Sequence, residues 1–177
     1  MLEFFVCAGI ARLGRYLLTF ILLAPTVLYF APAAAGEWNL LINGKTFHLN
    51  APADSHYNEK NWGIGLQYGV SQSGSPWVRF VNASQFRDSN ENISYYVGGG
   101  MAHRWFPVTA LPEAHVDLGI VAFLMRREGF HDGNWFPGIL PVLSIGGESI
   151  ALNVTYIPKV DPKMVPLLFL QLKLRLP

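Results

Sequence analysis

The sequence has little charge and almost no cysteine. Charged residues make up 14% of the 177 residues and hydrophobic residues 51%, whereas an ordinary soluble domain carries about 25% charged residues. The formal net charge of +1 excludes a strongly basic surface, so we expect no nucleic-acid partner. The single cysteine, Cys7, lies near the N-terminus, and its absence elsewhere suits export to an oxidising compartment.

Long apolar runs are also missing, except at the N-terminus. Arg12 and Arg15 precede the apolar run LLTFILLAPTVLYF, which ends in APAAAGEW. A basic region, an apolar region and a small-residue site in this order are typical of a secretory signal peptide, and an uncleaved anchor helix is the alternative. We predict cleavage after Ala35. No later run approaches the roughly 20 apolar residues of a membrane helix, so we predict a signal peptide over 1–35 and one domain over 36–177.

Hydrophobic residues after this segment alternate with a period of two, which indicates strands. In LLFLQLKLRL, leucines fill one face, and the other carries Gln171, Lys173 and Arg175. Segments rich in turn residues, such as SQSGSP and RDSNEN, separate such runs. We expect about eight strands, near 37–48, 62–72, 76–86, 93–106, 114–127, 136–147, 150–158 and 166–176.

Eight amphipathic strands fit either a soluble barrel, with apolar side chains inside, or an outer-membrane barrel, with apolar side chains facing lipid. Export, strands of about ten residues and aromatic residues near the strand ends favour the membrane barrel. We therefore predict an all-β fold, an eight-stranded antiparallel up-and-down outer-membrane barrel. Its interior is just wide enough to be filled or to hold one small ligand. The tryptophans near strand ends are Trp62, Trp77, Trp105 and Trp135.

Glycine is frequent on the face expected to point inward. Glycine in a strand marks either the close approach of a ligand or a bulge and strong curvature. The first interpretation predicts an apolar slot for a hydrocarbon chain, and the second predicts only a tightly coiled sheet. The glycines concerned are Gly63, Gly65, Gly69, Gly98 and Gly100.

Two prolines, Pro137 and Pro141, lie in the apolar segment WFPGILPVL. Proline cannot donate a hydrogen bond to a strand ladder, so it belongs at edges and bulges. The pair indicates either simple strand initiation or a lateral opening through which lipid enters.

Asp88 and Ser89 form a polar pair in the loop after the segment 76–86. Serine acts as a nucleophile when a base removes its proton, but an Asp–Ser pair also commonly caps a turn. The sequence contains no GxSxG motif, zinc pattern or phosphate-binding loop, so we expect neither a metal nor a cofactor. The histidines available as bases are His48, His56, His103, His115 and His131.

Several segments, in order, resemble the PagP family of lipid A palmitoyltransferases. YNEKNWGIG (57–65) is similar to the family's YNE-x-x-WG segment, and FRDS (86–89) to its Phe-Lys-Asp-Ser. The spacing from Asp88 to Gly98 and Gly100 also matches, as do LPVL (140–143) and VTYIP (154–158). Asn61 and Ser149 stand where the family has prolines.

The resemblance implies an eight-stranded barrel that moves a palmitoyl chain from a phospholipid to lipid A. By motif, the catalytic residues fall on His48, Asp88 and Ser89, with His56 as the alternative base. Gly100 is implied as the floor of the acyl pocket, and Gly98 lines the same wall. We also expect substrate contacts at Gly63, Gly65, Pro137 and Pro141, and a monomer in the outer membrane. A lipid esterase or a non-catalytic lipid-binding barrel are the alternatives.

Overall fold

The computed structural model describes residues 35–52, 54, 57–107, 113–159 and 165–177. The predicted signal peptide therefore lies outside the described residues, apart from its last residue, Ala35. His56, the alternative base, also lies outside them.

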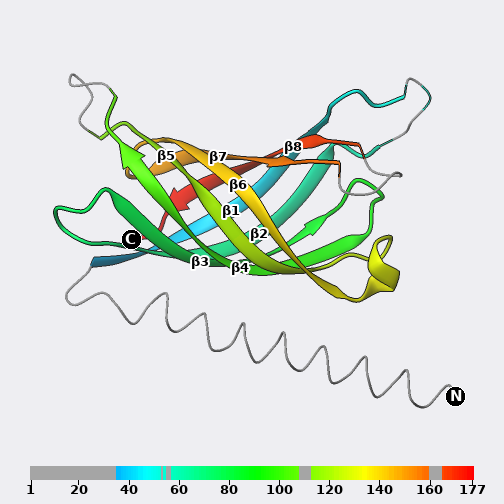
Figure 1. Cartoon of the computed structure of the whole chain (residues 1–177), viewed down its shortest axis with the longest axis horizontal. Coiled ribbons are helices and arrows are strands. Elements are labelled where there is room, and N and C mark those ends of the chain that lie inside the picture. The colour runs from blue at the N-terminus through cyan, green and yellow to red at the C-terminus, as the bar shows by residue number, and fades with distance from the viewer. Residues whose placement is uncertain (1–34, 53, 55–56, 108–112, 160–164) are drawn as a thin grey trace, which may run out of the picture. The chain divides into compact units, whose positions relative to one another are not determined.

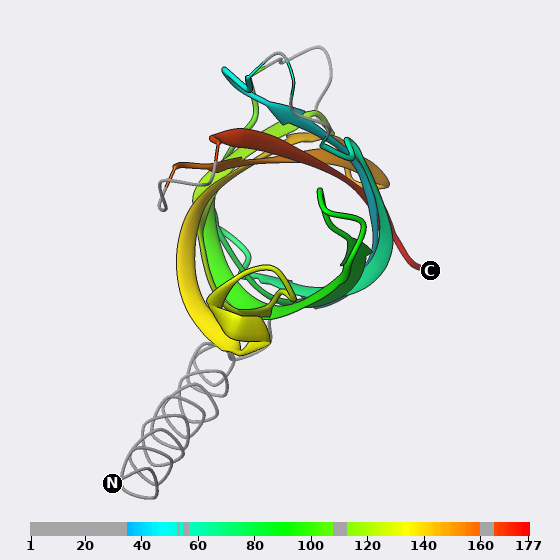
Figure 2. The ribbon, with the colours of Figure 1, turned by 90° about the vertical axis from the view of Figure 1, so that its right-hand side faces the viewer.

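Eight antiparallel strands close into one barrel in the order of the chain (Figure 1; Figure 2 looks along the barrel). A short 3-10 helix, η1 (His131–Gly133), lies between β5 and β6. The described part of the chain contains no helix long and apolar enough to cross a membrane. The strands are β1 (Ala35–His48), β2 (Lys60–Ser71), β3 (Trp77–Arg87), β4 (Ile93–Trp105), β5 (His115–Arg126), β6 (Trp135–Gly146), β7 (Ile150–Ile157) and β8 (Leu167–Arg175).

The outer surface of the barrel carries apolar side chains. Ile139 is 70% exposed and Ile64 is 62% exposed, and both would be unfavourable in water. The four tryptophans predicted near strand ends are exposed at 40–64%. An apolar band between aromatic residues at both ends is the surface of an outer-membrane barrel. The sequence-based choice of apolar side chains outward is confirmed.

The barrel has two different ends. At the loop end, which lies on the right of Figure 1, β1, β3, β5 and β7 finish. The opposite end has the β2–β3 and β6–β7 turns and the C-terminus. The loop from Asp88 to Asn92 joins β3 to β4 at the loop end.

The ladder between β6 and β7 covers only part of the barrel height. β6 pairs with β5 along its whole length, from Trp135 to Gly146. It pairs with β7 only from Val142 to Gly146. Pro137 and Pro141 lie in the part of β6 without a β7 partner, and both are exposed. We call the segment Trp135–Pro141 of β6 and the adjacent end of β7 the open seam.

The inward glycines bring neighbouring strands close together. A Cβ atom on Gly65 would lie 2.6 Å from Ser84 Cβ, and one on Gly98 would lie 2.8 Å from Ala122 O. A Cβ on Gly100 would lie 2.6 Å from Phe80 Cζ. Real Cβ atoms do not approach this closely, so these positions favour the interpretation of a tightly coiled sheet, and they do not themselves leave open space.

Candidate active site

His48 and Ser89 contact each other at the loop end. His48 is the last residue of β1, and Ser89 follows β3 in the loop to β4. His48 Nε2 lies 3.1 Å from Ser89 Oγ, which is hydrogen-bond distance. Ser89 is buried, at 8% exposure. A histidine nitrogen beside a serine hydroxyl is the arrangement that activates the hydroxyl or takes its proton.

The Asp88 side chain forms hydrogen bonds within the loop that also carries Ser89. Its carboxylate accepts hydrogen bonds from the backbone N–H of Asn90 and Asn92, the hydroxyl of Ser94 and Arg127 Nε, at 2.9, 3.0, 3.2 and 2.9 Å. Asp88 is 2% exposed. Among the described contacts of this carboxylate there is none with His48. The geometry therefore makes Asp88 the residue that fixes the turn beside Ser89.

The second nitrogen of His48 is less firmly held. The imidazole ring stacks on Tyr57 with ring centroids 4.4 Å apart. Nδ1 has no hydrogen-bond partner in the described part of the chain, and Glu59 Oε1 lies 4.0 Å from it. Stacking fixes the plane of the ring, and the Glu59 carboxylate lies on the side of Nδ1.

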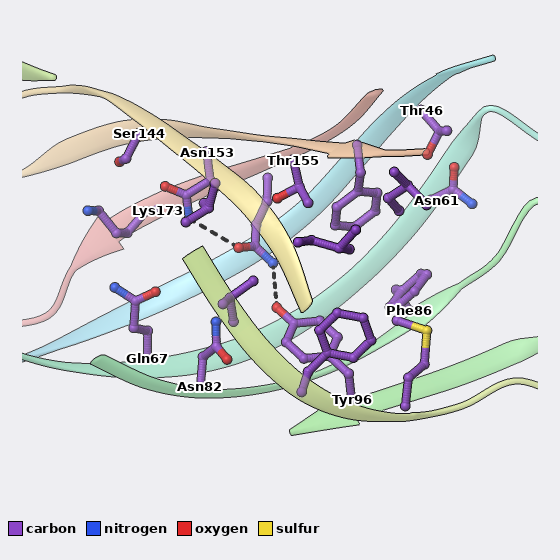
Figure 3. A pocket seen from close by; sticks show the side chains of 18 of the residues that line it. Thr46, Asn61, Gln67, Asn82, Phe86, Tyr96, Ser144, Asn153, Thr155 and Lys173 are labelled. Carbon is purple, nitrogen blue, oxygen red and sulfur yellow. Dashed lines mark hydrogen bonds between the residues drawn. The ribbon is translucent and has the colours of Figure 1, made fainter. Parts of the chain in front are cut away.

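A narrow cavity of about 120 Å³ runs from Asp88 and Ser89 into the barrel. Near the loop end, apolar and polar side chains both line it, among them Phe86 and Asn61 (Figure 3). Farther from the loop end the lining is mixed: it includes the apolar side chains of Val78 and Phe80 as well as the polar side chains labelled on the left of Figure 3. The polar lining side chains are Gln67, Asn82, Ser144, Asn153 and Lys173.

Comparison with known proteins identifies the family. The family model "Antimicrobial peptide resistance and lipid A acylation protein PagP" matches residues 33–171. The chain belongs to the PagP family.

Three PagP relatives, each named as a lipid A acyltransferase, illustrate the similarity. That of Methylobacillus flagellatus is 29% identical over 129 residues, which cover 70% of this chain and 67% of the relative. That of Musicola paradisiaca is 33% identical over 108 residues, covering 58% and 52%. That of Bordetella pertussis is 30% identical over 127 residues, covering 70% and 68%. The matched part thus spans between about half and two thirds of these relatives.

The predictions of a PagP lipid A acyltransferase and of an outer-membrane barrel are confirmed. The phospholipid donor, the monomeric state and the roles of individual residues stay predictions. The structure brings His48, Asp88 and Ser89 together at one end of the barrel, as the PagP resemblance implied. Gly63 and Gly65 lie on β2, and Gly98 and Gly100 lie on β4.

Sequence reasoning missed two polar residues of this PagP site. Arg127 follows β5 and binds the buried Asp88, and it is the first residue after the strand. The amide group of Asn61 donates from Nδ2 to Arg87 O at 2.8 Å, while its Oδ1 has no partner among the described residues. Asn61 lines the cavity and is 1% exposed. The signal for Arg127 was its position: it follows a strand that ends at the same end of the barrel as the strand before Asp88.

Proposed function

We propose that this PagP protein takes a fatty acyl chain from a phospholipid and that His48 and Ser89 carry out its transfer to lipid A. The observation that carries the proposal is the His48–Ser89 contact of 3.1 Å at the mouth of a cavity that is lined in part by apolar side chains. An ester held at the mouth would place its acyl chain in the cavity. The PagP resemblance implies palmitoyl as that chain.

The chemistry requires proton transfer at one oxygen. The hydroxyl oxygen of lipid A attacks the ester carbonyl carbon of the phospholipid, and His48 takes its proton. The C–O bond to the glycerol oxygen then breaks, and that oxygen receives the proton from His48 as the lysophospholipid leaves. In this direct route, Ser89 donates a hydrogen bond that orients the ester or stabilises the oxyanion.

A two-step route uses the same two side chains. Ser89 Oγ attacks the ester while His48 takes its proton, the lysophospholipid leaves, and the lipid A hydroxyl then attacks the acyl-serine. Quenching the enzyme with donor but without acceptor distinguishes the routes, because only the second route leaves an acyl group on Ser89. Intact mass measurement detects that group.

Lipid entry is assigned to the open seam. Pro137 and Pro141 have no N–H to donate, so β6 keeps its pairing with β5 while β7 stays unpaired next to them. An acyl chain moving laterally from the bilayer would meet fewer hydrogen bonds here than at a fully paired strand. In this proposal, Gly98 and Gly100 shape the slot by admitting the side chains of Phe123 and Phe80.

Export completes the proposal. Cleavage after Ala35 would release a chain that begins at Gly36, and the mature protein would act as a monomer. N-terminal sequencing of protein from the outer membrane tests the cleavage site, and a first residue other than Gly36 refutes it.

The decisive experiment is mass spectrometry of lipid A from cells with and without this protein. We expect one additional acyl chain only in cells that contain it, and a loss of that chain with Ser89→Ala or His48→Gln. Unmodified lipid A in both cells overturns the proposal. Release of free fatty acid by the purified protein without any acyl transfer to lipid A supports an esterase instead.

A further inference from the structure

The His48 ring has a hydrogen-bonding requirement that Ser89 does not meet. When His48 Nε2 takes a proton, it uses a lone pair, so the hydrogen of the neutral ring must lie on Nδ1. Nδ1 is buried without a hydrogen-bond partner in the described part of the chain, and the side chain is only 3% exposed. A buried N–H group without an acceptor is costly. The proposed function therefore requires an acceptor beside Nδ1.

The Asp88 carboxylate is already engaged by other donors. Its Oδ1 accepts from the backbone N–H groups of Asn90 and Asn92, and its Oδ2 accepts from Ser94 Oγ and Arg127 Nε. The two oxygens of a carboxylate offer about four lone-pair sites. Four donors therefore occupy the Asp88 carboxylate, which leaves the Nδ1 hydrogen of the histidine to another acceptor.

Glu59 is the acid that lies beside Nδ1. Its Oε1 is 4.0 Å from His48 Nδ1, and its Oε2 is 3.6 Å from Lys45 Nζ. No other carboxylate of the described residues lies within ion-pair distance of His48. The Glu59 carboxylate thus lies between a lysine and the histidine, with a different oxygen nearest to each.

Backbone hydrogen bonds hold Glu59 between the strand of His48 and the loop of Ser89. Thr46 N donates to Glu59 O at 2.9 Å, and Thr46 lies two residues before His48 on β1. Asn58 N donates to Ser89 O at 2.9 Å. Two consecutive residues, Asn58 and Glu59, are therefore bonded to the elements that carry both members of the His48–Ser89 pair.

A small approach of the Glu59 side chain would complete the hydrogen bond to Nδ1. Bonds of the N–H···O⁻ type are about 2.7–2.9 Å long, so Oε1 has to move about 1 Å toward the ring. The Glu59 side chain is 44% exposed, so solvent surrounds much of it, whereas the His48 ring is stacked on Tyr57. Catalytic hydrogen bonds are often long in a free enzyme and shorten when substrate binds.

We propose that Glu59 is the carboxylate that positions His48, and that Asp88 instead fixes the turn of Ser89. This inference rests on the proposed function. His48 Nδ1–H donates to Glu59 Oε1, which selects the tautomer with a lone pair on Nε2. The proton of the attacking hydroxyl goes to Nε2 and leaves Nε2 for the glycerol oxygen, while Nδ1 keeps its hydrogen and the carboxylate stays ionised.

The first test determines which ring nitrogen of His48 carries the hydrogen. Nitrogen NMR of purified protein labelled with ¹⁵N-histidine distinguishes the tautomers at neutral pH, and the spectrum of His48→Gln identifies the His48 signals. We expect the hydrogen on Nδ1 in the unaltered enzyme and a shift toward Nε2 in Glu59→Leu. Hydrogen mainly on Nε2 in the unaltered enzyme, or the same tautomer in Glu59→Leu, overturns the inference. This readout involves no acyl transfer, so the proposed function is judged separately.

The second test separates kcat from KM. Glu59→Leu removes the acceptor at similar size, and we expect kcat to fall about 10- to 100-fold. KM for both lipids should stay within about twofold, because Glu59 acts through His48 and not on the lipids. Glu59→Gln keeps an acceptor oxygen and should lose less activity. The matched control is Glu91→Gln, which removes an exposed acid of the β3–β4 loop and should leave kcat unchanged.

Coupling between the two side chains distinguishes positioning from a purely structural role. In a His48→Gln background, Glu59→Leu should cause no further loss of acyl transfer, because its effect passes through His48. Full activity of Glu59→Leu, or an equal loss with and without His48, overturns the inference and leaves the proposed function standing. A folded unaltered enzyme that transfers no acyl chain to lipid A overturns the proposed function instead. If Glu59→Leu does not fold, the tautomer of the unaltered enzyme and the kcat of Glu59→Gln decide.

Discussion

Removing the guanidinium that holds Asp88 should disable the site while leaving the barrel intact. Arg127 Nε lies 2.9 Å from Asp88 Oδ2, and the Asp88 carboxylate is almost fully buried. A hydrogen bond to a charged group contributes about 1.5–3 kcal/mol. In Arg127→Gln, Asp88 keeps its bonds to Asn90, Asn92 and Ser94 but loses its counter-charge. We expect the turn that carries Ser89 to lose about 2 kcal/mol of stabilising free energy. If the whole of this loss appears in the transition state, kcat/KM falls about 30-fold, and this is the largest fall that we expect.

The neighbouring Arg126 provides a matched control. It is exposed, and its Nε donates to Gly133 O at 3.1 Å, away from Asp88. Arg126→Gln should therefore keep acyl transfer within about twofold of the unaltered enzyme, and Arg127→Lys should recover part of the loss because it restores the charge. Acyl transfer is measured with purified protein, and the unfolding midpoint in urea reports the barrel. Equal activity of Arg127→Gln and the unaltered enzyme would refute the role assigned to this ion pair.

Three other changes test separate parts of the molecule. Ser89→Ala and His48→Gln should each lower kcat/KM by about 10²–10⁴, measured by acyl transfer, and full activity in either variant contradicts the assigned site. The double change Pro137→Val and Pro141→Val supplies the missing N–H groups, so we expect a higher unfolding temperature and slower transfer from bilayer-embedded donors; unchanged transfer argues against the open seam as the entry route. Gly100→Ala should lower the unfolding midpoint, because its Cβ would lie 2.6 Å from Phe80 Cζ and would also meet Ile120 O, and an unchanged midpoint would show that the strands adjust freely.

The positions of the strands were predicted from the sequence to within a few residues. Alternation with a period of two continues through nearly every strand, and turn residues mark its ends, so the predicted segment 93–106 became β4 (Ile93–Trp105). The direction of the apolar face was also predicted, because export, strands of about ten residues and aromatic residues near the strand ends favoured a membrane barrel, whose apolar side chains face lipid. Local pattern is sufficient for a fold in which each strand pairs with its neighbours in the chain.

The contacts within the candidate active site were predicted less completely from the sequence. The resemblance located His48, Asp88 and Ser89, yet only the structure showed that the carboxylate of Asp88 binds Arg127. That pairing joins residues 39 positions apart in the chain, and its partner depends on register across the barrel. The prediction about the glycines was ambiguous for a related reason, since period alone cannot distinguish an open slot from a close approach of two strands.

Side-chain hydrogen bonds and an ion pair cross the lumen of the barrel. Gln171 reaches from β8 to Tyr96 on β4, and the Arg104–Asp117 ion pair lies farther along the lumen. The enzyme can therefore open toward the bilayer on one side without providing a continuous aqueous path for ions and small solutes. A cell that produces this protein in quantity keeps the permeability barrier of its outer membrane. Variants that remove the Gln171–Tyr96 hydrogen bond should be judged by ion conductance as well as by catalysis, since a barrel without it would be closer to becoming a leak.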